Sequence, residues 1–316
     1  MQLPARQPKK AARWLSAEAL SGIVGVEGKA FPGPRIPIFK GAGKAHGQHS
    51  MQALPLALLA FVFYLAAASW QGLTLIRRVP PRDLLVRGFG TLAAALHLVV
   101  AGGLLALEGS MLPGLSTSAV LVTALAVVVL LGASLFKPVL NIAAVLFPFA
   151  GVVLLLGTEL PTPTSANGMT PGIAFHAVSS ALAFAVLAIA SLQAILVGVQ
   201  NKALKHHRIR GVVQALPPLT TMERVLFEMI WVGMALLTLA MASGFVFLDN
   251  MFAQHLVHKT VLSLLAWLVF AVLLLCHYRL GWRGMRAVRW TLGGYIALLL
   301  AYFGSKFVLE VLLAHS

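Results

Sequence analysis

The 316-residue chain is 59% hydrophobic and only 10% charged, whereas an average soluble domain carries roughly 25% charged residues. A water-soluble fold of this size would lack the charged side chains that cover a protein surface. The formal net charge of +15 is a feature of many nucleic-acid-binding proteins, but the placement of the basic residues along this chain argues against that function.

The first 50 residues differ in composition from the rest of the chain. They contain scattered lysines, arginines and prolines, and no apolar run long enough to cross a membrane. They also lack the apolar region and cleavage site of a signal peptide. We therefore expect a disordered basic tail at 1–50 and a membrane domain at 51–316. Met51 directly precedes the first apolar run, so a translation start at Met51 is the alternative to a real tail.

Eight apolar segments follow the tail, and each is long enough to cross a hydrocarbon core of about 30 Å at 1.5 Å per residue. They comprise residues 53–76, 88–107, 117–136, 139–157, 173–199, 226–248, 259–277 and 291–313. The predicted fold class is therefore an all-α membrane protein of about eight transmembrane helices.

The loops between these segments alternate in charge. Of the 24 lysines and arginines, 14 lie in every second loop: Arg77, Arg78, Arg82, Arg87, Lys137, Lys202, Lys205, Arg208, Arg210, Arg224, Arg279, Arg283, Arg286 and Arg289. The intervening loops at 108–116, 158–172 and 249–258 contain neither residue type. The positive-inside rule then predicts a bacterial inner-membrane protein whose basic loops are cytoplasmic and whose membrane domain has periplasmic ends. The expected partner is the lipid bilayer, and nucleic acid is excluded.

Histidines at the ends of two spans are the first candidates for chemistry, because polar side chains in a bilayer are costly. His176 opens the fifth span and His258 opens the seventh, both on the predicted periplasmic side. Two neutral imidazoles at one depth can ligate a haem iron from both faces. Aromatic residues nearby, namely Phe175, Phe252 and Trp267, suit a haem ring. The alternative is that each imidazole meets only water or a backbone carbonyl.

Other polar residues have both a structural and a functional interpretation. Ser179 and Ser180 lie one turn after His176 and can orient it or simply ease helix packing. His97 lies mid-span, where a helix–helix hydrogen bond would satisfy it. Lys306 and Glu310 are spaced i, i+4 and can form an ion pair. Together His97, Lys306 and Glu310 are also the residues that a small-solute or ion transporter would use.

The chain shows no catalytic motif. Its single cysteine, Cys276, provides no disulfide framework and no thiolate metal cluster. Walker A, dinucleotide-binding, HExxH and GxSxG sequences are absent from the chain. An enzyme is therefore not predicted.

Three stretches resemble a known family of membrane proteins. They are SGFVFLDNMFAQHLVHKTVLSLLAWLVF at 243–270, CHYRLGWRG at 276–284 and AYFGSKFVLEVLLAHS at 301–316. They are similar to the cytochrome c assembly family, the CcsA-, ResC- and CcmC-type proteins that handle haem, and most of all to its YpjD-like or HemX-like subgroup. The resemblance covers residues 51–316 and is strongest from 173 onward.

The resemblance implies haem as the cofactor and assigns roles to four histidines. His176 matches the first periplasmic ligand, and His315 falls where the second is expected. His277, before the GWRG loop, matches the family's membrane histidine. His258 lies in the loop that carries tryptophans in other members.

That loop departs from the family pattern. Residues 248–258 read LDNMFAQHLVH and contain no tryptophan, whereas ligase members present haem to the apocytochrome with a WxWD-type motif. The resemblance therefore implies a haem-handling assembly factor without full ligase activity, with other cytochrome assembly or inner-membrane proteins as partners. The alternative is a non-haem membrane partner or regulatory subunit with the same fold.

Overall fold

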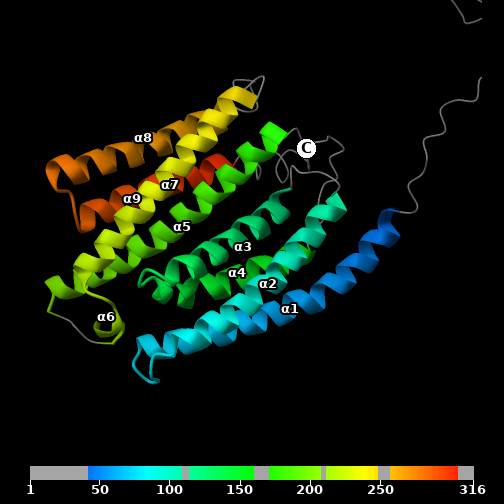
Figure 1. Ribbon diagram of the computed structural model, residues 1–316, viewed down its shortest axis with the longest axis horizontal. Coiled ribbons are helices and arrows are strands. Elements are labelled where there is room, and N and C mark those ends of the chain that lie inside the picture. Colours follow the sequence, from blue (N-terminus) through cyan, green and yellow to red (C-terminus); the bar gives the residue numbers. More distant parts are fainter. Residues whose placement is uncertain (1–41, 109–113, 160–170, 208–210, 248–256, 305–316) are drawn as a thin grey trace, which may run out of the picture. The chain divides into compact units, whose positions relative to one another are not determined.

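The computed structural model describes residues 42–108, 114–159, 171–207, 211–247 and 257–304 (Figure 1). Within these ranges the side chains of 42–52, 107–108 and 258 are not described. Every regular element in the described ranges is a helix. Eight of the helical segments there are long and apolar enough to cross a membrane. The predicted all-α membrane class with eight spans is thus confirmed.

The elements follow one another in a simple order along the chain. They are α1 (Ala42–Leu75), α2 (Asp83–Glu108), α3 (Leu115–Ser134), a 3₁₀ turn (Leu140–Ile142) leading into α4 (Ala143–Glu159), α5 (Pro171–Lys205), the short α6 (Val212–Ala215), α7 (Leu219–Phe247), α8 (Val257–Leu280) and α9 (Met285–Leu299), which continues as a π-helical turn (Leu300–Gly304).

Several helices extend beyond the spans expected from hydropathy. The expected spans of α2 and α7 began after Arg87 and Arg224, but the helices begin at Asp83 and Leu219. Charged side chains end the hydrocarbon region without ending the helix, because they reach water from the headgroup region. At the other end of the chain, α1 begins at Ala42 and so includes residues 42–50 of the expected tail. The rest of the tail lies outside the described residues.

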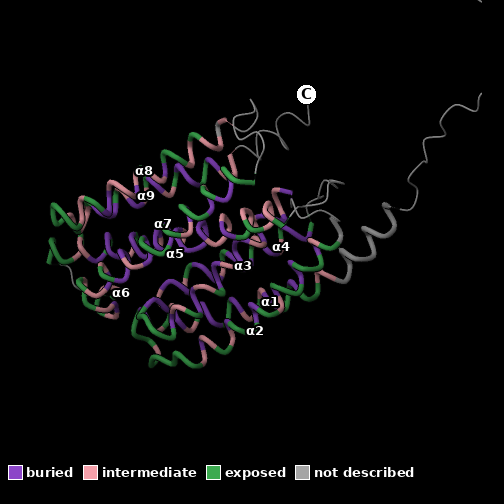
Figure 2. Tube along the Cα trace, turned by 45° about the horizontal axis from the view of Figure 1, so that its top comes forward, coloured by how far each residue is buried: buried purple, intermediate pink, exposed green. Residues whose placement is uncertain are grey.

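Helix α5 is the centre of the packing. It packs most extensively against α7 and also contacts α9 and α3, while α3 packs against α2 and α4, and α8 against α9 and α7 (Figure 1). In their most apolar windows, 61% of α5 is buried, against 28% of α1 and 22% of α8. Figure 2 shows the same contrast in the burial of the individual residues. Helices α1 and α8 therefore present most of their surface to lipid or to partners.

Glycines allow α5 and α7 to approach closely in antiparallel orientation. A Cβ added at Gly233 of α7 would come within 2.5 Å of the Leu187 Cδ2 of α5. At the end of the pair that carries His176, a Cβ at Gly172 of α5 would overlap the Phe247 ring of α7. Small residues at such crossings favour close packing of membrane helices.

The four basic loops gather at one end of the described helices. Three polar contacts join them or hold them to α7: Arg77 Nη2 to the Gln214 carbonyl (2.8 Å), Lys137 Nζ to Glu228 Oε2 (2.6 Å), and the Gly284 N–H to Glu223 Oε1 (2.8 Å). The alternation of charge along the sequence thus corresponds to one polar end of the bundle.

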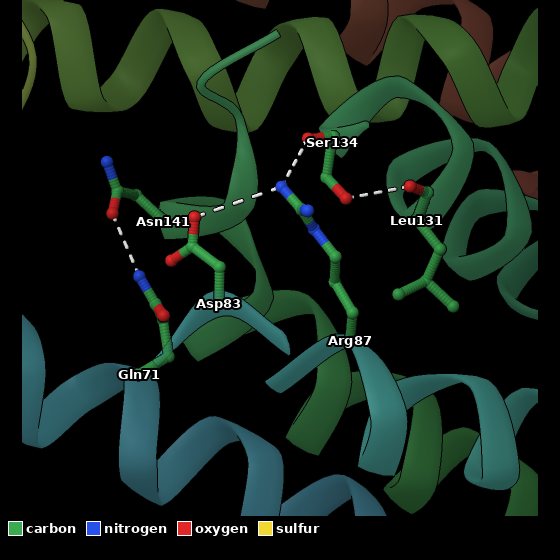
Figure 3. Close-up of polar contacts among 6 residues, drawn as sticks. All are labelled: Gln71, Asp83, Arg87, Leu131, Ser134 and Asn141. Atoms are coloured by element: carbon green, nitrogen blue, oxygen red, sulfur yellow. Dashed lines mark hydrogen bonds and ion pairs between the residues drawn. The ribbon is translucent and has the colours of Figure 1, made fainter. Parts of the chain in front are cut away.

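At this basic end, α1 and α2 are joined to the α3–α4 connection by side-chain hydrogen bonds (Figure 3). The Gln71 Nε2 donates to Asn141 Oδ1 at 2.9 Å, and Arg87 Nη2 donates to the Ser134 carbonyl at 2.7 Å. Asp83 lies 3.8 Å from the same Arg87 nitrogen. These bonds fix the basic ends of the first four spans relative to one another.

Candidate functional site

His176 lies in the first turns of α5, at the end of the helix opposite the basic loops. Pro171 is the first residue of α5, a position where proline is favoured because its missing N–H would have no helical partner. The basic residues of the last turn, Lys202 and Lys205, lie at the far end of the same helix. His176 is half-buried.

The imidazole of His176 is held by a backbone carbonyl of α7. Its Nδ1 lies 2.7 Å from the Ala240 carbonyl oxygen. A carbonyl oxygen can only accept a hydrogen bond, so Nδ1 carries the proton and donates. In the neutral ring the Nε2 is then unprotonated and has a free lone pair. This is the arrangement found in metal-ligating histidines, whose other ring nitrogen donates to a carbonyl or carboxylate.

Ser243 of α7 completes the contact with the ring. Its Oγ donates to the Ala240 carbonyl at 2.9 Å and lies 3.4 Å from His176 Nδ1. The sequence instead suggested Ser179 and Ser180 as orienting residues, but the Ser179 Oγ donates to the backbone carbonyl of His176. Ser243 could have been predicted as a partner of His176 from an antiparallel pairing of α5 and α7. That pairing brings the last turns of α7 beside the first turns of α5.

Exposed apolar side chains occur on the end turns of α5 and α7 that carry His176 and Ser243. Phe175 and Val178 of α5 and Phe245 and Val246 of α7 are each about half exposed or more. The unprotonated Nε2 and these apolar side chains are of the kinds that a haem needs, namely a nitrogen ligand and an apolar surface. Of the other aromatic residues expected here, Trp267 donates its Nε1–H to Thr238 Oγ1 at 3.0 Å.

The expected second ligands are not described. The side chain of His258 and all of His315 lie outside the described residues, as do Phe252, Lys306 and Glu310. The backbone of His258 belongs to the first turn of α8. Helix α8 packs mainly against α9 and α7, and α5 packs mainly against α7, α9 and α3. Pairing of His258 with His176 stays a prediction.

His277 lies at the opposite, basic end, in the last turn of α8. Its Nδ1 donates to the Trp282 carbonyl at 2.8 Å, which again leaves Nε2 unprotonated in the neutral ring. The imidazole stacks on Phe227 with ring centroids 3.4 Å apart and meets Tyr278 edge-on at 5.0 Å. In both His176 and His277, the Nδ1 therefore donates to a backbone carbonyl. The two residues lie at opposite ends of the bundle, so the structure does not bring them together.

One ring nitrogen of His97 makes the helix–helix hydrogen bond that the sequence allowed, whereas the buried Nε2 has no hydrogen-bond partner among the described residues. His97 is completely buried in α2, and its Nδ1 lies 3.1 Å from the Tyr64 hydroxyl of α1. The hydroxyl and imidazole join the two helices within the apolar interior, where an unpaired polar group is costly.

The described residues include no group of three or more His, Cys, Asp or Glu arranged to hold a metal ion. Cys276 is a free, partly buried thiol. The candidate ligands in this part of the chain are therefore single imidazoles.

Comparison with known proteins places the chain in a family. The family model described as "Cytochrome C assembly protein" matches residues 91–313. The chain is 38% identical over 143 residues to the "Inner membrane protein YpjD" of Escherichia coli K12, which covers 45% of this chain and 54% of that protein. It is 35% identical over 159 residues to an "Uncharacterized 28.8 kDa protein in nifR3-like 5'region" of Azospirillum brasilense, covering 49% of this chain and 58% of that protein. The matched segments therefore span just over half the length of these relatives.

The family match extends from α2 to beyond α9 and includes both oriented histidines, His176 and His277. Together with the eight apolar helices, it establishes that this chain is a multi-pass membrane protein of the cytochrome c assembly family.

Proposed function

We propose that the chain is a haem-handling assembly factor and that His176 supplies one axial nitrogen to the haem iron. The observation that carries this proposal is the 2.7 Å hydrogen bond from His176 Nδ1 to the Ala240 carbonyl. This hydrogen bond fixes the tautomer and the orientation of the imidazole, and both favour ligation of a metal through Nε2. The family match supports haem as the ligand.

Different residues of this chain would have different roles in binding haem. A bound haem would supply an iron that acts as a Lewis acid toward imidazole nitrogens. His176 offers a nitrogen lone pair, Ala240 and Ser243 hold the imidazole, and Phe175, the exposed residue before His176, offers apolar surface. His258 or His315 would supply the second nitrogen, and His277 a separate site at the basic end.

The distribution of charge indicates on which side of the membrane the site lies. If the four basic loops face the cytoplasm, as the positive-inside rule requires, His176 lies at the periplasmic face of the inner membrane. Because the loop at 248–258 has no tryptophan, we propose handling of haem without ligation to an apocytochrome.

The test is the visible spectrum of the purified protein. Wild-type protein expressed with sufficient haem should show a Soret band and sharp reduced α and β bands, as expected for low-spin haem with two histidine ligands. His176→Ala should lose the low-spin spectrum or the haem itself, because one axial position is empty or taken by water. Added imidazole should restore part of the spectrum. His206→Ala, in an exposed turn after α5, is the matched control and should change nothing.

Comparing His258→Ala with His315→Ala then identifies the second ligand. Loss of the low-spin spectrum in the first supports pairing through α8, and loss in the second supports the order found in the family. Wild-type protein without haem would refute the proposal and favour a non-haem partner or regulatory subunit.

A further inference from the structure

The end of α8, the start of α9 and the loop between them carry a concentrated positive charge. Arg279, Arg283, Arg286 and Arg289 all lie within eleven consecutive residues, and all four are exposed. Ion pairs in the described part of the chain occupy only Asp83 and Glu228, and Glu223 accepts the Gly284 N–H. None of the four arginines has an ion-pair partner among the described residues. Their charge is available to an external anion.

The loop between α8 and α9 is held by hydrogen bonds and contains two glycines with positive φ. Gly281 and Gly284 have φ values of +66° and +59°, which side chains with a Cβ rarely adopt. The Trp282 N–H bonds back to the Cys276 carbonyl at 3.2 Å, and the Gly284 N–H donates to the Glu223 carboxylate of α7 at 2.8 Å. A binding surface on a fixed loop loses little conformational entropy when it binds.

Aromatic and apolar side chains flank the arginines. The Trp282 and Trp290 rings lie 5.5 Å apart, and Trp231 donates its Nε1–H to the Tyr278 hydroxyl at 2.8 Å. Leucines on the same turns of α8 are also exposed, among them Leu275 (59%) and Leu280 (67%). Tryptophan and tyrosine are enriched where a helix leaves the hydrocarbon core, which places the arginines at headgroup depth.

We propose that the α8–α9 hairpin binds the headgroup of an anionic phospholipid, with Arg286 and Arg289 contacting the phosphate. These two residues are three apart on α9 and therefore lie on one face of the helix. A guanidinium makes two parallel hydrogen bonds to a phosphate, which an ammonium group does not. The exposed leucines and aromatic rings beside them suit the acyl chains. A partner that carries both phosphate and hydrocarbon matches both parts of the surface.

The experiment measures lipid binding by native mass spectrometry of the purified full-length protein in detergent. Phosphatidylglycerol and phosphatidylcholine are titrated separately, and the ratio of their dissociation constants gives the preference for the anionic lipid. Wild-type protein should prefer phosphatidylglycerol. The double variant Arg286→Lys and Arg289→Lys keeps the charge, and hence the membrane orientation, but removes the paired hydrogen bonds. Its affinity for phosphatidylglycerol should fall about tenfold, because an ammonium group does not make the paired hydrogen bonds to the phosphate.

The matched control is the double variant Arg78→Lys and Arg224→Lys, which changes two exposed arginines at the same end of the protein. It should keep the wild-type preference. An equal loss in both variants would show that exposed arginines anywhere at this end contact the lipid, and the hairpin site would be refuted. An unchanged affinity for phosphatidylglycerol in the Arg286/Arg289 variant would show that charge alone binds the lipid, and would refute the hairpin site as well.

Discussion

Replacing Gly233 by alanine tests the close contact between α5 and α7 that positions His176. The added Cβ would lie 2.5 Å from Leu187 Cδ2 and 2.6 Å from Leu187 Cγ. Leu187 is completely buried, so its side chain has little room to move. The helices must separate, or the leucine must leave its preferred rotamer.

The cost of this substitution can be separated from the helix propensity of alanine. Overpacking a buried site typically costs about 1–3 kcal/mol, whereas glycine to alanine in a helix gains up to about 1 kcal/mol. Gly102 of α2 provides the comparison, since an added Cβ there meets no atom within 4 Å. Gly102→Ala should be neutral or stabilising. The two variants should therefore differ by roughly 1–3 kcal/mol, because the propensity gain cancels between them.

The assay is unfolding in mixed detergent micelles with increasing sodium dodecyl sulfate, followed by circular dichroism. Gly233→Ala should unfold at a lower fraction of the denaturing detergent than wild type, and Gly102→Ala should not. If both variants shifted equally and in the same direction, the α5–α7 contact would not be as close as described.

Two further predictions concern the buried hydrogen bond and the membrane orientation. Tyr64→Phe removes the partner of His97 Nδ1 and should lower the free energy of unfolding by about 1 kcal/mol in the same assay; an unchanged value would mean that this bond adds no stability. Reporter fusions after residues 210 and 286 should be cytoplasmic, and a fusion after residue 165 should be periplasmic. The opposite result at two of these three positions would reverse the proposed orientation of His176.

Much of the fold follows from hydropathy and charge. Apolar length predicted eight spans, and alternating charge predicted that loops distant in sequence share one end, as the contact from Arg77 to the Gln214 carbonyl confirms. The helix ends were harder to predict. Hydropathy marks where the hydrocarbon region ends, but a helix continues as long as its backbone hydrogen bonds are made, so α7 includes Arg224 and begins five residues before it.

The candidate site was predictable only in part. His176 was identified because an imidazole near a bilayer is costly and therefore informative. Its partners, Ala240 and Ser243, lie 64 and 67 residues away on another helix. A backbone carbonyl has no sequence signature, so the contact appears only when the packing of α5 against α7 is known. The pairing of His97 with Tyr64, 33 residues apart, required the packing of α1 against α2 in the same way.

The two oriented histidines differ in how their orientation is produced. His277 is held by a carbonyl only five residues ahead, in the same hairpin, so its geometry is complete once the end of α8 has turned. His176 is held by a carbonyl 64 residues ahead, so its imidazole is free to rotate until α7 has inserted and packed against α5. During synthesis the hydrogen bond from His176 to the Ala240 carbonyl can therefore form only after α7 has been made. A chain that ended before α7 would contain His176 without a fixed tautomer.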